Sequence, residues 1–156
     1  MRSLVRSFLI LLSSFFLASA HAGQDEPGQV AAASARARDI ANRLQAALDP
    51  DQKGRVTMAV GILDNGKVII ATSENENRLR SPLQEIRTAE GADLADGPRG
   101  HAEAKIVDYV RSSLFLYRNR RILVIAAGRP ICETCEQAIV NAGARPANAC
   151  KSGRTY

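Results

Sequence analysis

The spacing of apolar residues predicts a helix near the start of the folded region. Between Gln29 and Leu48 apolar side chains recur at steps of three and four residues, and Asp49-Pro50 ends the run. Residues at this spacing share one face of a helix. We therefore expect an amphipathic helix over 29–48. Its apolar face would carry Val30, Ala33, Ala37, Ile40, Leu44 and Leu48.

Two short apolar runs follow, at 56–62 and 68–72, and Asn65-Gly66 lies between them. Asn-Gly in this position is the strongest short signal for a β-hairpin, because both residues of a type I′ turn take positive φ. The pattern predicts two antiparallel strands joined by that turn.

A polar connection of 27 residues, 74–100, comes next. Connections of this length are usually functional or disordered. One short helix is predicted within it. Ser81 would be its N-cap, Pro82 its first residue, and Gln84 the second member of a capping box.

The second half of the chain predicts a helix, a strand and a helix. Helical spacing begins near His101, and the unbroken apolar run 122–127 is typical of a central strand covered on both faces. The last helix should begin near Cys132 and end at Gly143. Residues 144–156 have at most weak strand character.

This order of elements predicts an α/β fold with a small mixed sheet, made of the hairpin plus a parallel strand, and flanking helices. The crossover from the hairpin through a helix to the 122–127 strand should be right-handed and parallel. Because both later helices would follow strands that run in the same direction, their N-termini should lie at the same edge of the sheet.

The first 20 residues are typical of a signal peptide. Arg2 and Arg6 precede the apolar stretch 8–17, and cleavage after Ala20 or Ala22 fits the small residues there. We therefore predict export, one domain over 21–156 with its core at about 55–143, and no stable membrane span after cleavage.

Charge and aromatic content narrow the choice of partner only slightly. The formal charge is +5 at pH 7 and falls to +3 without Arg2 and Arg6. A mild positive balance is compatible with a nucleic-acid or nucleotide partner. The four aromatic residues after residue 20 are few for a stacking platform that binds single strands.

Four residues form the candidate chemical site. His101 and Glu103 fall at the start of one predicted helix, and Cys132 and Cys135 at the start of the next. A histidine and two cysteines give three zinc ligands, the number found in catalytic sites that keep a fourth position open. Helix N-termini favour thiolate over thiol.

The strings HAE at 101–103 and PICETC at 130–135 together resemble the H-x-E and P-C-x-x-C motifs of the zinc-dependent cytidine deaminase-like superfamily. Among its members, the compact secreted deaminase domains of bacterial toxins look most similar. The resemblance covers roughly 55–143 and implies the family's three-layer fold.

The resemblance also implies roles for the four residues. His101, Cys132 and Cys135 would hold Zn²⁺, and Glu103 would move the proton in a hydrolytic deamination. The substrate would be a cytosine-type base, or less favourably an adenine-type base, in a nucleoside, nucleotide or nucleic acid. A toxin would also require an inhibitor (immunity) protein in its producer.

The chain departs from the family pattern in three places. Ile131 separates Pro130 from Cys132, where the family has proline directly before cysteine. The connection 74–100 is longer than in free-nucleoside deaminases. The tail after the last helix has little room for the family's further strand.

Two other functions remain open on the sequence. Cys150 as a fourth ligand would close a Cys3His structural zinc site in a binding module. Cys132 and Cys135 could instead be the C-x-x-C pair of an exported thiol-disulfide oxidoreductase. That second function leaves His101 and Glu103 without a role.

Arginines of the long connection are candidates for phosphate contacts. They could bind phosphate groups of a substrate if the pocket opens beside this connection. Six acidic residues in the same connection weaken this argument. These arginines are Arg78, Arg80, Arg87 and Arg99.

Overall fold

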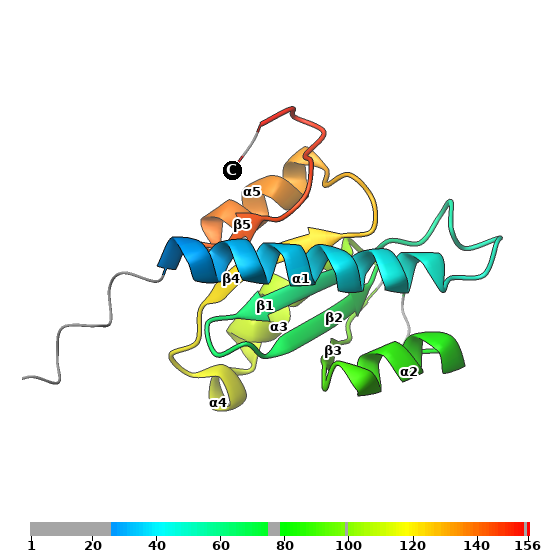
Figure 1. Ribbon diagram of the computed structural model, residues 1–156, viewed down its shortest axis with the longest axis horizontal. Coiled ribbons are helices and arrows are strands. Elements are labelled where there is room, and N and C mark those ends of the chain that lie inside the picture. The colour runs from blue at the N-terminus through cyan, green and yellow to red at the C-terminus, as the bar shows by residue number, and fades with distance from the viewer. Residues whose placement is uncertain (1–25, 75–78, 99, 155) are drawn as a thin grey trace, which may run out of the picture.

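The computed structural model describes residues 26–74, 79–98, 100–154 and 156, and shows three layers (Figure 1). The predicted signal peptide lies outside these residues, as do Arg78 and Arg99. The elements are α1 (Glu26–Ala46), β1 (Met58–Leu63), β2 (Val68–Thr72), α2 (Ser81–Ala89), β3 (Asp93–Ala95), α3 (Ala102–Ser112), α4 (Leu114–Tyr117), β4 (Ile122–Ala127), α5 (Glu133–Asn141) and β5 (Arg145–Pro146).

The five strands form one mixed sheet in the order β3-β2-β1-β4-β5. Strand β1 is antiparallel to both β2 and β4, so β2 and β4 run in the same direction on either side of it. The outer strands β3 and β5 pair in parallel with β2 and β4. The predicted α/β class, with a mixed sheet between helices, is confirmed.

Alternation along the strands divides the core between the two faces. Met58 and Val60 of β1 pack in a cluster with α1, whereas Ala59 and Leu63 pack in a cluster with α3 and α5. The predicted apolar face of α1 is likewise in the core. Figure 1 shows α1 along one face of the sheet and α3 on the other.

Glycine allows α3 to lie close against the sheet. A Cβ added at Gly61 in the middle of β1 would come within 2.7 Å of Cγ2 of Ile106 on α3. Both residues are in the hydrophobic interior, where overlap of this kind forces backbone shifts. The absence of a side chain at position 61 therefore sets the distance of α3, and with it the position of His101 at the N-terminus of that helix.

The hairpin has the predicted strands but a different turn. Gly66 donates its N–H to the carbonyl of Leu63 at 2.9 Å, and Leu63 donates to Lys67 at 3.0 Å. Gly66 has φ of +79°, but Asn65 is not among the described residues with positive φ. This geometry is a longer loop ending in a left-handed glycine, so the type I′ expectation was wrong.

The capping prediction for α2 was also wrong. Arg80 is the N-cap and Ser81 is the first helical residue, with no side-chain hydrogen bond at the cap. Leu79 and Leu83 are both buried in the core beneath α1. Packing of these two leucines therefore decides where the helix begins, and the serine side chain does not.

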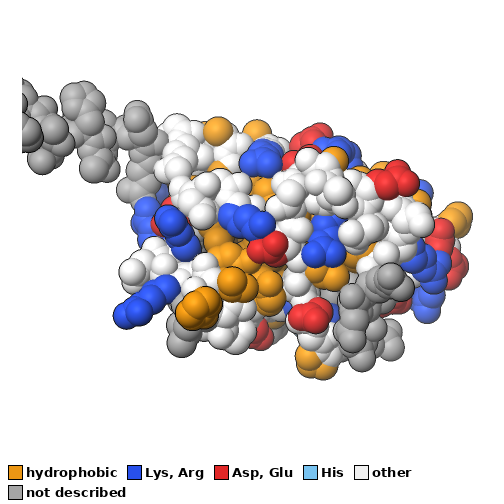
Figure 2. All heavy atoms as spheres, turned by 90° about the horizontal axis from the view of Figure 1, so that it is seen from below, with side chains coloured by type: hydrophobic (Ala, Val, Ile, Leu, Met, Phe, Trp, Pro, Cys, Tyr) orange, Lys and Arg blue, Asp and Glu red, His pale blue; other side chains and the backbone are white. Residues whose placement is uncertain are grey.

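The described part of the chain has few exposed large apolar side chains. None of the described helices is both long and apolar enough to cross a membrane. Phe115 and Leu116 of α4 are the most exposed large apolar side chains of the described part. Figure 2 shows the face at the bottom of Figure 1, where hydrophobic and basic side chains are interspersed.

An ion pair joins α1 to the end of α2, and it should make the fold sensitive to acid. Arg43 lies 2.8 Å from one carboxylate oxygen of Glu90, and Arg36 lies 3.2 Å from the other. Hydrogen bonding from Arg43, and then from Arg36, holds the pKa of Glu90 below its ordinary value. The stabilisation is therefore complete above that ordinary pKa and is lost as the pH falls through the lowered, native pKa.

We expect Glu90→Gln to lower the free energy of unfolding at neutral pH by roughly 0.5–1 kcal/mol, because both arginines are partly solvated. Denaturant titrations between about pH 7 and pH 2 measure this, and the difference from wild type should vanish at the acid end. Glu85→Gln, at an exposed position on the same helix, is the control. An equal loss in both variants would contradict a specific role for Glu90.

Candidate metal centre

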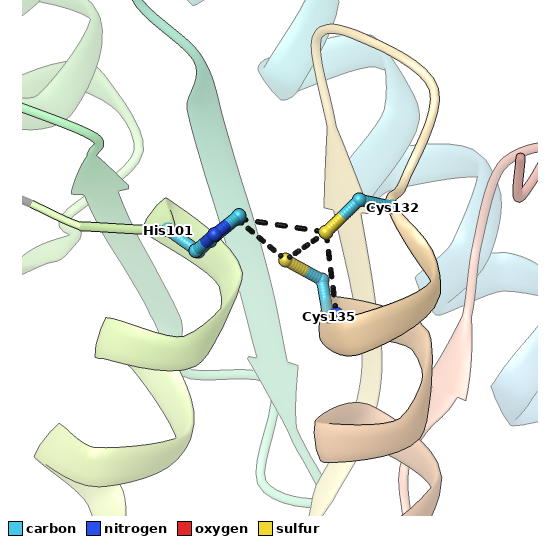
Figure 3. Close-up of side chains that lie close together, drawn as sticks. All are labelled: His101, Cys132 and Cys135. Atoms are coloured by element: carbon cyan, nitrogen blue, oxygen red, sulfur yellow. Dashed lines mark hydrogen bonds between the residues drawn. The ribbon is translucent and has the colours of Figure 1, made fainter.

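Three side chains converge between the N-termini of α3 and α5 (Figure 3). Nδ1 of His101 lies 3.1 Å from Sγ of Cys135 and 3.5 Å from Sγ of Cys132. The two sulfur atoms are 2.9 Å apart. Of the His, Cys, Asp and Glu residues that the structure describes, only these three form a group of three or more whose ligand atoms all lie within 4.8 Å.

The local backbone presents all three side chains toward the same point. His101 is the N-cap of α3 in an extended conformation, and its ring makes no capping hydrogen bond. Cys132 is the N-cap of α5, where its sulfur accepts the N–H of Cys135 at 3.4 Å. Because α3 and α5 pack on the same face of the sheet, two motifs about thirty residues apart meet at one place.

The donor set fits a metal ion. With Zn–S of about 2.3 Å and Zn–N of about 2.0 Å, the donor atoms of a tetrahedral site lie about 3.5–3.8 Å apart. The observed separations of 2.9 to 3.5 Å need only a small expansion. The sulfur–sulfur distance is far longer than the 2.03–2.05 Å of a disulfide, and both cysteines are free. The group could therefore hold a metal ion.

Burial raises the pKa of the Cys135 thiol above its ordinary value, and the neighbouring Cys132 and Glu103 raise it further. At Cys135, burial therefore opposes the preference for thiolate that is expected at a helix N-terminus. A bound cation would replace the thiol proton, as in other cysteine sites.

Glu103 lies beside the three donors in the first turn of α3. Its side chain is only 4% exposed, and it lines a cavity of about 380 Å³ together with His101 and Cys132. This volume is within the range of small-molecule sites. The structure thus places Glu103 in the same cavity as His101 and Cys132, while its role in proton transfer stays a prediction.

Cys150 lies outside the donor group. It is 7% exposed, its sulfur points toward the carbonyl oxygen of Asn148 at 3.8 Å, and a backbone bridge pairs it with Ile131. Burial raises the pKa of its thiol. A closed four-ligand site would therefore require this segment to leave its packed position.

Several residues of the cavity were not predicted from the sequence. Arg55, Arg129 and Lys151 line it, together with Thr57 and Ser73. Only Arg129 could have been predicted to lie near the site, because it stands between the end of a predicted strand and the cysteine motif. The others come from segments that no motif connects to the site.

Two of the four arginines that were candidates for phosphate contacts are described in the structure, and both lie away from the cavity lining. Arg80 pairs with Asp49, and Arg87 donates to the carbonyl of Ala92 at 3.1 Å. Neither lines the cavity. The pocket does open beside Gly100 at the end of the long connection, but the described cations that line it, Arg55, Arg129 and Lys151, belong to other segments.

No family model, no curated protein and no solved structure matches this chain. The assignment of function therefore depends on the geometry of the site and on the motifs.

Proposed function

We propose that this protein is a zinc-dependent hydrolase that deaminates a cytosine-type base, with an adenine-type base as the second choice. The observation that carries this proposal is the convergence of His101, Cys132 and Cys135, two of which line one cavity together with the buried Glu103. Such a donor set, with a carboxylate that is not a ligand, is the arrangement of zinc deaminases.

The metal would be zinc, since mixed imidazole and thiolate donors suit it and do not suit Mg²⁺ or Ca²⁺. When bound, zinc would lower the pKa of a water molecule to about 7 and so supply a nucleophile at neutral pH. Three protein ligands would leave a fourth coordination position for water.

In this proposal Glu103 moves the protons. Its carboxylate would accept one proton from the attacking water and deliver it to the ring nitrogen, and would then carry the second proton of that water to the departing amine. The balance is one amino group replaced by one carbonyl oxygen, with one water consumed and one ammonia released. Burial of Glu103 in the cavity lining would keep it out of bulk water, where other proton donors would compete.

The arrangement favours this function over the two alternatives. A thiol-disulfide oxidoreductase needs no histidine, yet His101 lies 3.1 Å from the sulfur of Cys135. A closed Cys3His module needs Cys150, which is packed outside the group. An open three-ligand site uses all four residues of the two motifs.

We also propose that the protein is exported and acts as a toxin or effector on another cell. Support comes from the sequence of residues 1–20 and from the resemblance to secreted deaminase domains. Bound zinc would protect Cys132 and Cys135 from oxidation outside the cytoplasm. An inhibitor protein in the producing cell is part of this proposal.

Ammonia release by the zinc-loaded protein tests the activity. We expect release from at least one member of a panel containing cytidine, cytidine monophosphate, adenosine monophosphate and single-stranded oligonucleotides. A chelator should abolish the release, and added zinc should restore it. Zinc-loaded protein that releases no ammonia from any of these substrates would contradict the proposal.

A further inference from the structure

The mouth of the cavity carries three basic side chains from three separate segments of the chain. Arg55 precedes β1, Arg129 follows β4, and Lys151 belongs to the segment after β5. All three are exposed, whereas Glu103 in the same lining is buried. These three exposed side chains, here called the mouth of the cavity, share its lining with His101, Cys132 and the buried carboxylate of Glu103.

Local contacts hold part of this mouth in place. Nη1 of Arg129 donates to the carbonyl oxygen of Gly54 at 2.9 Å, which joins the segment after β4 to the residue before Arg55. The backbone N–H of Lys151 donates to the carbonyl of Ile131 at 2.8 Å. Lys151 is thereby fixed beside the loop that leads to Cys132.

Two of the three cations lack an acidic partner. Arg55 pairs with Asp51 at 3.4 Å, but no carboxylate of the described residues lies within ion-pair distance of Arg129 or Lys151. The other acid of the lining, Glu74, accepts a hydrogen bond from Gln52 at 3.4 Å. Arg129 has its contact with Gly54, but no ion pair among the described residues accounts for either Arg129 or Lys151 at this opening.

We propose that Arg129 and Lys151, with Arg55 beside them, form a phosphate-binding subsite at the mouth of the cavity. The substrate would then be a phosphorylated nucleoside or a phosphodiester strand, and not a free nucleoside or base. This inference rests on the proposed function for the identity of the base, but it concerns different residues. Guanidinium and ammonium groups bind phosphate oxygens by charge-assisted hydrogen bonds.

Binding of reaction products provides the test, because products are not consumed. Calorimetry on the zinc-loaded full chain measures the dissociation constants of three ligands. They are uridine, uridine 5′-monophosphate and a single-stranded oligodeoxyuridine of about ten nucleotides. We expect the monophosphate to bind at least about ten-fold tighter than uridine, and its affinity to fall with added salt.

The Arg129→Gln/Lys151→Gln double variant should remove this advantage. The matched control is Arg38→Gln/Arg118→Gln, which removes two exposed arginines that do not line the cavity. Arg129→Lys keeps the charge and should keep most of the preference, which separates phosphate binding from loss of the contact with Gly54.

The two sources of phosphate give different results. An oligonucleotide that binds much tighter than the monophosphate, with a steeper salt dependence, identifies a polynucleotide substrate, and equal affinities identify a mononucleotide. Either result supports the subsite. Equal binding of uridine and its monophosphate by wild type, or an unchanged preference in the double variant, would overturn it.

The two proposals can fail separately. Ammonia release without any preference for phosphorylated ligands would contradict the proposed subsite and support the proposed deaminase activity. A preference for phosphate that depends on Arg129 and Lys151, in a protein that deaminates nothing, would remove the deaminase and leave the subsite.

Discussion

Replacing Glu103 with glutamine is expected to reduce ammonia release by at least about 10²–10⁴-fold while leaving one zinc ion bound per chain. Positioned acid–base groups contribute rate factors of this size. Glutamine has nearly the shape of glutamate but cannot take a proton from water or give one to the amine. Because Glu103 is not one of the three convergent donors, the metal content should be unchanged.

Steady-state assays and zinc analysis on the same preparation separate the two effects. Glu133→Gln is the matched control, since Glu133 is an exposed acid in the first turn of α5 and does not line the cavity. It should keep both metal and activity. A Glu103→Gln protein that binds zinc and retains full activity would contradict the proposed mechanism.

The elements that the sequence predicted well are those in which local pattern and burial agree. The strands at 68–72 and 122–127 were predicted with the bounds they have, because every residue in both is buried and the runs are sharply delimited. The helices at His101 and Cys132 also begin where expected. In these segments the tertiary contacts favour the same secondary structure that the local sequence pattern favours.

The missed strands are short and depend on their neighbours. β3 has three residues within the polar connection and β5 has two in the tail, so neither gives an alternating pattern. Each exists because it pairs in parallel with a strong strand, β2 or β4. Pairing of this kind is a property of the assembled sheet and leaves no local signal.

The same distinction applies to the site. His101, Glu103, Cys132 and Cys135 could be placed together because each pair opens a helix and both helices follow strands of the same direction. Arg55 and Lys151 could not, since they reach the cavity through a turn before β1 and a bridge after β5. The residues at the mouth of the cavity can therefore be identified only from the tertiary structure.

The metal ligands can be identified one at a time. We expect His101→Ala, Cys132→Ser and Cys135→Ser each to lower bound zinc from one equivalent to nearly none at neutral pH, because two remaining donors do not complete a stable zinc site. Cys150→Ser should keep a full equivalent, since Cys150 is packed outside the donor group. Metal analysis after dialysis against a weak chelator measures this series.

X-ray absorption at the zinc edge then counts the ligands directly in the wild-type protein. Two sulfur atoms, one imidazole nitrogen and one oxygen would describe an open site, with zinc–sulfur distances of about 2.3 Å. Three sulfur atoms, together with loss of zinc in Cys150→Ser, would mean that the tail rearranges to close the site. The fourth coordination position would then be unavailable to water. This result would contradict the proposed enzymatic function and support a structural zinc module.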